Sequence, residues 1–248
     1  MAEKIAKKAT AETQPALNKK EDFILKYKNL IIGGVIAIVA IIVGIVFWNN
    51  HKAAKLREAQ TASVVPQTSM YNAEEALMNG MNDFSEQNYL AALNGDSATK
   101  SMGFLKIADE YSSTPAGNVA NLYAGLCYAH MDKWDEAVKY LEKFDDAGDL
   151  LISPAARAAL GNAYAHVNKL DEAVKALQQA GEKADNILQS PIYYIQAGEI
   201  LEAQGKKNEA LEMYKKVKQY ERAKGISGIS QSSYYVDIID EYIERLSQ

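Results

Sequence analysis

The sequence has one cysteine, three histidines and five prolines among its 248 residues. A lone cysteine excludes an internal disulfide, a cysteine-rich zinc site and an iron–sulfur cluster held by this chain alone. Three histidines leave few ligands for a metal centre. The scarcity of proline, together with only 15 glycines, excludes collagen-like and Pro/Gly low-complexity architectures. With 48% hydrophobic and 24% charged residues, the chain has a globular rather than a wholly disordered composition.

Enzyme signatures are also missing. The sequence contains no GxSxG, HExxH, Walker or GxGxxG pattern. The acidic pairs Asp135-Glu136 and Asp171-Glu172 could serve as general acids and bases, but they recur from repeat to repeat, which favours a role at helix starts. We therefore expect no catalytic residues, cofactor, metal or small-molecule substrate. The net charge of −5 further opposes nucleic acid as a partner.

One long apolar run is present, at residues 30–48, and it contains no charged side chain. As a helix it would be about 28 Å long, which matches the hydrocarbon core of a bilayer. A buried helix of a soluble domain would need a polar face, and this run has none. A cleavable signal peptide would have a shorter apolar region followed by small residues, whereas Phe47 and Trp48 end this run. We expect an uncleaved transmembrane helix.

Charge is distributed unevenly around this run. Residues 1–29 carry seven lysines and four acidic residues, whereas the rest of the chain carries 20 basic and 28 acidic residues. By the positive-inside rule, the lysine-rich flank stays in the cytoplasm and the body is translocated. Residues 49–68, the expected linker, also carry the basic side chains of Lys52, Lys55 and Arg57, so both flanks of the run are basic.

The body is repetitive. Two small residues recur together at intervals of 36 and then 37 residues, which sets one register for three units. They are Gly125, Gly161 and Gly198 in the first half of each unit, and Ala137, Ala173 and Ala210 in the second half. Apolar residues around both markers follow helical spacing. We therefore predict helix pairs that approach closely at the small residues.

Helix starts are predicted from the same register. Ser153-Pro154 and Ser190-Pro191 would begin first helices, with serine as the N-cap and proline next to it. An Asp or Asn before Glu-Ala would cap each second helix; these residues are Asp135, Asp171 and Asn208. Cys127, on a first helix, is expected to be a buried small hydrophobe rather than a nucleophile.

These units resemble the tetratricopeptide repeat family. Two units carry its small and aromatic positions, and the third has Leu201 in place of the first-helix tyrosine. The matching residues are Gly125, Tyr128, Ala137 and Leu141, then Gly161, Tyr164, Ala173 and Leu177, then Gly198, Ala210 and Tyr214. The resemblance implies an α-solenoid. Together with the apolar run at residues 30–48, it predicts an all-α fold in which a single N-terminal transmembrane helix precedes the solenoid and its C-terminal capping helix.

The expected solenoid covers residues 69–229, with clear units at about 115–153, 154–190 and 191–222. Upstream, a helix at about 69–81 and another at Phe104–Tyr111 would form a degenerate unit. The stretch Asn88–Asp96 between them departs from the family pattern, and residues 82–98 are left unplaced. Residues 230–248 would form a capping helix, because solenoids need their open ends covered.

In this family the first helices line a concave groove that binds partner proteins. The resemblance places nine residues there, although each could instead pack against the next repeat: Leu122, Leu126, His130, Ala158, Asn162, His166, Ile195, Glu199 and Glu202. Recognition of a peptide C-terminus by the family's carboxylate clamp is not expected, because Leu122 and Ala158 occupy its lysine position. As a metal pair, His130 and His166 lack a third ligand.

The whole layout resembles the YfgM-like ancillary subunits of the bacterial Sec translocon. That resemblance implies a single-pass protein of the inner membrane, with a cytoplasmic N-terminus and a periplasmic repeat domain. Its partners would be translocon subunits, envelope chaperones or client polypeptides. Two alternatives remain: a scaffold of another envelope complex, in cell division or outer-membrane assembly, or a receptor that faces the cytoplasm.

Overall fold

The computed structural model describes residues 40–97, 100–220 and 231–247. The chain divides into two compact units, residues 1–55 and 56–248. In the first unit, residues 40–55 are helical and expose large apolar side chains between Ile41 and Trp48. Residues 30–39 of the expected transmembrane helix lie outside the described residues. Among the helices that the structure does describe, none has both the length and the apolar character needed to cross a membrane.

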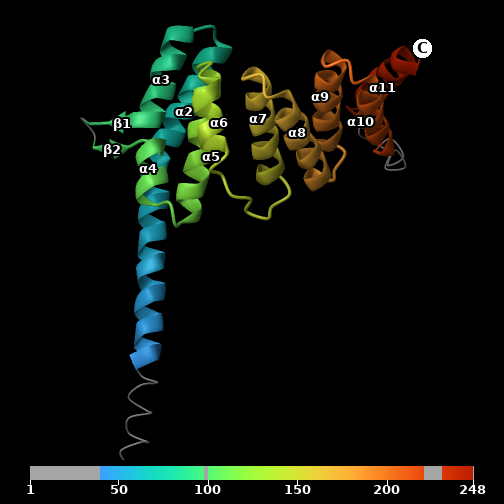
Figure 1. Ribbon diagram of the computed structural model, residues 1–248. Helices are drawn as coiled ribbons and strands as arrows, with labels where there is room; N and C mark the ends of the chain where they lie inside the picture. The colour runs from blue at the N-terminus through green and yellow to red at the C-terminus, as the bar shows by residue number, and fades with distance from the viewer. Residues whose placement is uncertain (1–39, 98–99, 221–230, 248) are drawn as a thin grey trace, which may run out of the picture. The chain divides into compact units, whose positions relative to one another are not determined.

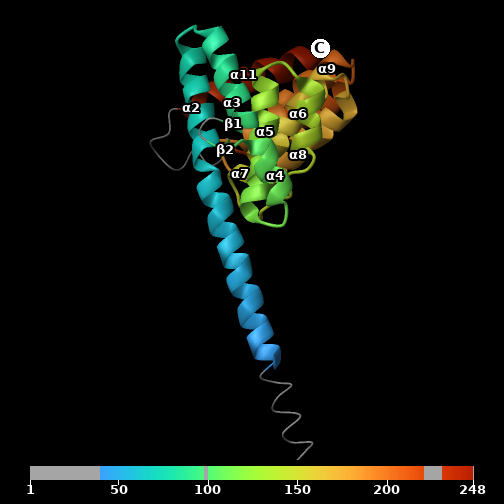
Figure 2. The ribbon, with the colours of Figure 1, turned by 90° about the vertical axis from the view of Figure 1, so that its left-hand side faces the viewer.

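The second unit is a row of helices in which each helix packs mainly against its neighbours in sequence (Figures 1 and 2). The all-α prediction is confirmed for this unit, apart from one short antiparallel hairpin, β1 (Gly95–Asp96) with β2 (Ser101–Met102). The helices are α2 (Val64–Met78), α3 (Asn82–Asn94), α4 (Phe104–Glu110), α5 (Pro115–His130), α6 (Trp134–Leu141), α7 (Ile152–His166), α8 (Leu170–Ala184), α9 (Ser190–Ala203), α10 (Lys207–Gln219) and α11 (Gln231–Ser247).

Three helix pairs, α5–α6, α7–α8 and α9–α10, pack through the predicted small residues. A Cβ added at Gly125 would lie 2.6 Å from Leu141 Cγ, and one added at Gly161 would lie 2.8 Å from Leu177 Cγ. At Gly198 the same atom would lie 2.3 Å from a ring carbon of Tyr214. The alanines of the second helices, Ala137, Ala173 and Ala210, are fully buried. The predicted close approach is therefore confirmed.

The turn inside each pair has its own marker, a residue with a left-handed backbone. Asp132, Asn168 and Gly205 have φ values of 57°, 60° and 74° at equivalent positions. Gly80, between α2 and α3, has φ of 74°. Because this conformation is unfavourable for most residues, its recurrence identifies α2–α3 as the first helix pair, in the same register as the other three.

The structure corrects the prediction for the first pair. Helix α2 begins at Val64, before the expected start at about 69, and α3 covers most of the unplaced stretch. The family pattern fails here because Tyr89 of α3 takes the place of Leu141, Ala73 replaces the usual glycine, and the hairpin interrupts the chain after α3. Ser85 hydroxyl donates to the Ala73 carbonyl at 2.8 Å, which ties the two helices together.

The predicted serine N-caps are wrong. Helices α7 and α9 have Leu151 and Gln189 as their N-cap residues. An Asx side chain upstream accepts the free N–H groups instead: Asp149 accepts from Leu151 N at 2.8 Å and from Ile152 N at 2.5 Å. Asn186 likewise accepts from Leu188 N and Gln189 N. Ser190 hydroxyl is turned inward and donates to the Gly181 carbonyl.

The predicted caps of the second helices are also wrong. These helices have Lys133 and Lys169 as N-cap residues, two positions earlier than predicted, so Asp135 and Asp171 lie in the first turn, where their negative charge interacts favourably with the helix dipole. Asp171 instead accepts from Lys206 Nζ at 2.7 Å, in the turn of the next pair. This hydrogen bond lowers the pKa of the Asp171 carboxyl.

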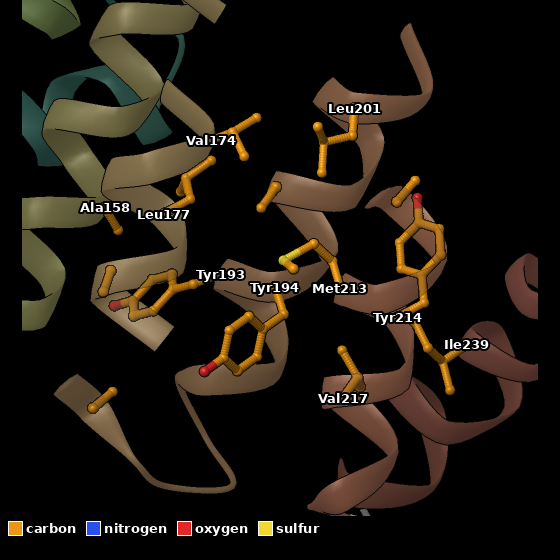
Figure 3. Packing of buried hydrophobic residues seen from close by; sticks show 14 residues of the cluster. Ala158, Val174, Leu177, Tyr193, Tyr194, Leu201, Met213, Tyr214, Val217 and Ile239 are labelled. Carbon is orange, nitrogen blue, oxygen red and sulfur yellow. The ribbon is translucent and has the colours of Figure 1, made fainter. Parts of the chain in front are cut away.

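The core consists of three successive clusters rather than one. The C-terminal cluster joins α8, α9, α10 and α11 through Leu177, Tyr194, Leu201, Tyr214 and Ile239, all buried (Figure 3). Its position explains how the row ends: α11 covers side chains of α9 and α10 that a further repeat would otherwise cover. The predicted cap at residues 230–248 corresponds to α11.

Replacing Gly161 with leucine should destabilise the domain by about 1–3 kcal/mol, because Leu177 occupies the space of the new side chain. Chemical denaturation would measure this. Ala155→Leu is the matched control, since Ala155 lies on the same helix and is exposed. Equal stability of the two variants would contradict the packing register.

Removing the side chains that cap α7 and α9, Asp149 and Asn186, should affect stability differently at acidic pH. Hydrogen bonds from Ser153 and the backbone hold the pKa of Asp149 well below its ordinary value. Asp149→Ala should therefore lose about 1 kcal/mol of stability at neutral pH. This loss should shrink as the pH falls below about 3.9, where the carboxyl protonates first in the unfolded chain. Asn186→Ala removes an uncharged cap, and its deficit should not vary with pH.

Candidate protein-binding groove

The first helices α5, α7 and α9 each leave one side partly uncovered. We call this side the open stripe. Its residues repeat at spacings of four, three and four, which keeps them on one helix face. All of them are half-buried or exposed: Val119, Tyr123, Leu126 and His130; Ala155, Ala159, Asn162 and His166; Ile192, Gln196, Glu199 and Ala203. The open stripe changes from aromatic and apolar on α5 to small and amide-bearing on α7, and on α9 it carries one acidic residue, Glu199.

A cavity of about 360 Å³ adjoins the open stripe between α2 and α5. Its lining is uncharged, with amide and hydroxyl groups from the α2 side and apolar side chains from α4 and α5. The principal residues are Gln60, Ser63 and Gln67 on one side, and Phe104, Val119 and Tyr123 on the other. A cavity of this kind suits an apolar side chain of a bound peptide, with the glutamine side chains hydrogen-bonding the backbone of that peptide.

The nine predicted groove residues differ in their exposure to solvent. Leu122 and Ala158 are buried, 6% and 4% exposed, and therefore pack inside the domain. Leu126, Asn162 and Ile195 are half-buried, and of these only the first two lie on the open stripe. Leu122 belongs to the buried cluster that contains Val138 and Leu141 of α6. Ala158 belongs to the one that contains Val174 and Leu177 of α8. The binding role of the remaining residues stays a prediction.

The two histidines among the predicted groove residues stack on aromatic rings. The His130 ring lies parallel to Tyr89 at a centroid distance of 5.0 Å, and His166 lies parallel to Trp134 at 3.6 Å. The second stack joins α6 to α7, so it contributes to the contact between neighbouring pairs. Within residues 40–97, 100–220 and 231–247, no group of three His, Cys, Asp or Glu residues is placed to hold a metal ion.

The two predicted acidic groove residues are engaged by α11. Arg245 donates to both carboxylate oxygens of Glu202, at 2.8 and 2.7 Å, and Tyr214 hydroxyl also donates to Glu202. Tyr242 hydroxyl donates to Glu199 at 3.0 Å. Burial and the carboxylate together raise the pKa of Tyr214. Glu199, the acidic residue of the open stripe on α9, and Glu202 beside it are thus both hydrogen-bonded by the capping helix.

The remaining candidate, Cys127, is fully buried and unpaired. Burial, with a smaller contribution from Glu74, raises the pKa of its thiol to about 12. A thiol with such a pKa is inert at neutral pH, so its prediction as a small buried hydrophobe is confirmed.

Sequence reasoning missed several residues of the open stripe and the cavity. Tyr123, Ala159 and Gln196 precede Leu126, Asn162 and Glu199 by three residues, and helical spacing alone could have identified them. Three other residues that line the cavity carry no such signal, because they fall in the region assigned to the linker: Gln60 and Ser63, which precede α2, and Gln67 in α2.

Docking of α11 should depend on its buried side chain more than on its ion pair. Ile239→Ala removes a fully buried side chain and should destabilise the C-terminal cluster by about 2–5 kcal/mol. Arg245→Ala removes a solvent-exposed partner and should lower stability by at most about 1 kcal/mol. Hydrogen exchange in α9 and α10 would report both, and a larger effect of the arginine variant would contradict this account of docking.

The chain is similar to one protein family and to several solved structures. A family model for a tetratricopeptide repeat-like domain matches residues 21–231. No curated protein matches the chain in sequence. Crystal structures of nearly identical TPR-like repeats, from a Podosopora anserina protein described as a kinesin light chain, have a TM-score of 0.50 at 15% identity. The match covers 75% of this chain and 94% of theirs. A crystal structure of MamA has a TM-score of 0.40 at 17% identity, over 70% of this chain and 91% of its own.

At 15% identity, the crystal structures with a TM-score of 0.50 show similarity of fold alone. The family model, in contrast, matches the amino-acid sequence itself over residues 21–231. No enzyme family is among these matches, and repeats of this type are generally non-catalytic scaffolds for protein–protein interaction. The sequence register, the paired helices and the matched range agree: the chain belongs to the tetratricopeptide repeat-like domain family.

Proposed function

We propose that the protein is a non-catalytic, membrane-anchored adaptor whose repeat domain binds proteins in the bacterial periplasm. Its partners would be subunits of the Sec translocon or envelope chaperones and their client polypeptides. The observation that carries the binding role is the open stripe on α5, α7 and α9, with the uncharged cavity beside it. The side chains there offer apolar contacts and amide hydrogen bonds, which together suit an extended or helical peptide.

The membrane role is supported by the sequence. Residues 30–48 have the length and the apolar character of a transmembrane helix, and lysines predominate on the N-terminal side. A tether of this kind would confine the groove to the membrane surface. Confinement raises the effective concentration of membrane partners, so weak contacts in the groove could suffice.

The Sec assignment rests on the resemblance to YfgM-like ancillary subunits in layout and repeats. Two other roles use the same fold. A scaffold in cell division or outer-membrane assembly would differ only in its partners, and a cytoplasm-facing receptor would differ in its topology. The set of captured partners and the accessibility of the body therefore distinguish the three.

Photo-crosslinking from position 162 in native membranes tests the binding role. Asn162 lies in the middle of the open stripe and is half-buried. The matched control is position 175, where Lys175 is exposed on the second helix α8. We expect translocon subunits or envelope chaperones to be captured from position 162 and not from position 175. Capture of only division or assembly proteins would favour the scaffold, and no difference between the positions would exclude the groove.

Protease treatment of intact spheroplasts tests the topology. The repeat domain should be degraded while residues 1–29 stay protected, because the lysine-rich flank is expected in the cytoplasm. A cytoplasmic control protein must remain intact in the same sample. Full protection of the repeat domain would instead favour the cytoplasm-facing receptor.

A further inference from the structure

The turn between α2 and α3 exposes four large apolar side chains within eight residues. Leu77, Met78, Met81 and Phe84 are 44%, 81%, 49% and 52% exposed. We call these four residues the apolar tip. The two helices that carry them are joined at one end of the pair in both views (Figures 1 and 2). Exposed apolar side chains are ordinary when they are scattered, but a cluster of four suggests an interaction surface.

The fold does not require apolar residues at these positions. The left-handed turn residue Gly80 corresponds to Asp132, Asn168 and Gly205. Counting from it, Met81 takes the position that is lysine in the other three pairs, and Phe84 takes the position that is glutamate. The residues replaced are Lys133, Lys169 and Lys206 for the methionine, and Glu136, Glu172 and Glu209 for the phenylalanine.

The turn that carries the apolar tip is well ordered internally. Met81 N donates to the Ala76 carbonyl at 2.9 Å, and Gly80 N donates to the Leu77 carbonyl at 3.0 Å. Buried Ala73, Ala76 and Ser85 fill the contact between the helices underneath. The apolar tip is thus outside the packed core of the pair, and its side chains are free for contact with another molecule.

Charge indicates what that molecule is. Residues 58–99 contain six acidic residues and no lysine, arginine or histidine. Four of the acids, Glu74, Glu75, Asp83 and Glu86, lie on α2 and α3 beside the apolar tip. A second copy of the chain would bring like charges together, and an anionic lipid surface would be repelled. A positively charged partner would be attracted.

We propose that the apolar tip binds a cationic amphipathic segment of another protein. Its apolar side chains would contact the methionines, whose flexible thioethers adapt to varied shapes, while its lysines or arginines would lie over the acids of α2 and α3. This inference rests on the proposed role in protein binding and gives the partner chemistry of a second surface, outside the open stripe.

The test uses the purified full chain in phosphatidylcholine nanodiscs, with empty nanodiscs as background. The probe is a fluorescent 18-residue amphipathic Leu/Lys peptide, compared by anisotropy with a Leu/Glu peptide of the same pattern. We expect the Leu/Lys peptide to bind at least about tenfold more tightly than the Leu/Glu peptide. Raising the salt concentration should weaken binding of the Leu/Lys peptide, because salt screens the attraction between its lysines and the acidic residues of α2 and α3.

The decisive variant is Met81→Lys with Phe84→Glu, which gives the first pair the residues of the other three turns without changing net charge. It should bind the Leu/Lys peptide at least about tenfold more weakly, at an unchanged melting temperature. Lys169→Gln, at the equivalent turn of α7–α8, should bind as the wild type does. If the double variant does not fold, Met78→Gln replaces it, because Met78 is the most exposed of the four residues.

Three results would overturn the proposal. They are equal binding of both peptides, unchanged binding by the folded double variant, and quenching of a fluorophore at position 78 by phosphatidylglycerol vesicles without any response to the Leu/Lys peptide. The last would indicate a lipid surface. None of them affects cross-linking from position 162, so failure here is distinguishable from failure of the adaptor role.

Discussion

The domain depends on one steric constraint, the absence of a side chain where the two helices of a pair cross. Leu141 and Leu177 rest directly on glycine backbone, and the ring of Tyr214 does the same at Gly198. The small residues of the second helices, Ala137, Ala173 and Ala210, are buried in the same contacts, so the two helices of each pair can approach closely. Because this contact recurs at a fixed interval in α5–α6, α7–α8 and α9–α10, these three pairs cross in the same register and stack into a row.

Periodicity and small residues were sufficient to predict this row over α5 to α10. The positions that define the row require either a small side chain at the helix crossing or an apolar side chain in the core, and both requirements are visible in the sequence. The prediction of the N-cap residues was wrong, because the same backbone groups can be hydrogen-bonded in more than one way. A free helix N-terminus can be satisfied by serine, by an upstream Asx side chain or by a charge in the first turn. Asp149 and Asn186 take that role here, and no local pattern distinguished them from ordinary loop residues.

The candidate groove was predictable only in part for a related reason. Helical spacing predicted Leu126 and Asn162 together with Leu122 and Ala158; the first two are half-buried, whereas the last two are buried. Residues four apart share a helix face, so spacing alone does not show which of them the second helix covers; that depends on contacts with Val138 and Leu141 for Leu122, and with Val174 and Leu177 for Ala158. The same holds for Glu199 and Glu202, whose partners on α11 lie 43 residues away.

The division of the core into three local clusters has a consequence for how the chain folds. Contacts between residues close in sequence mean a low contact order, which is typical of fast-folding helical proteins. Folding can begin in any pair and spread to its neighbours, and damage to one cluster weakens the adjoining pairs first. Such a domain can acquire structure progressively, from the first pair onward, while the rest of the chain is still being synthesised.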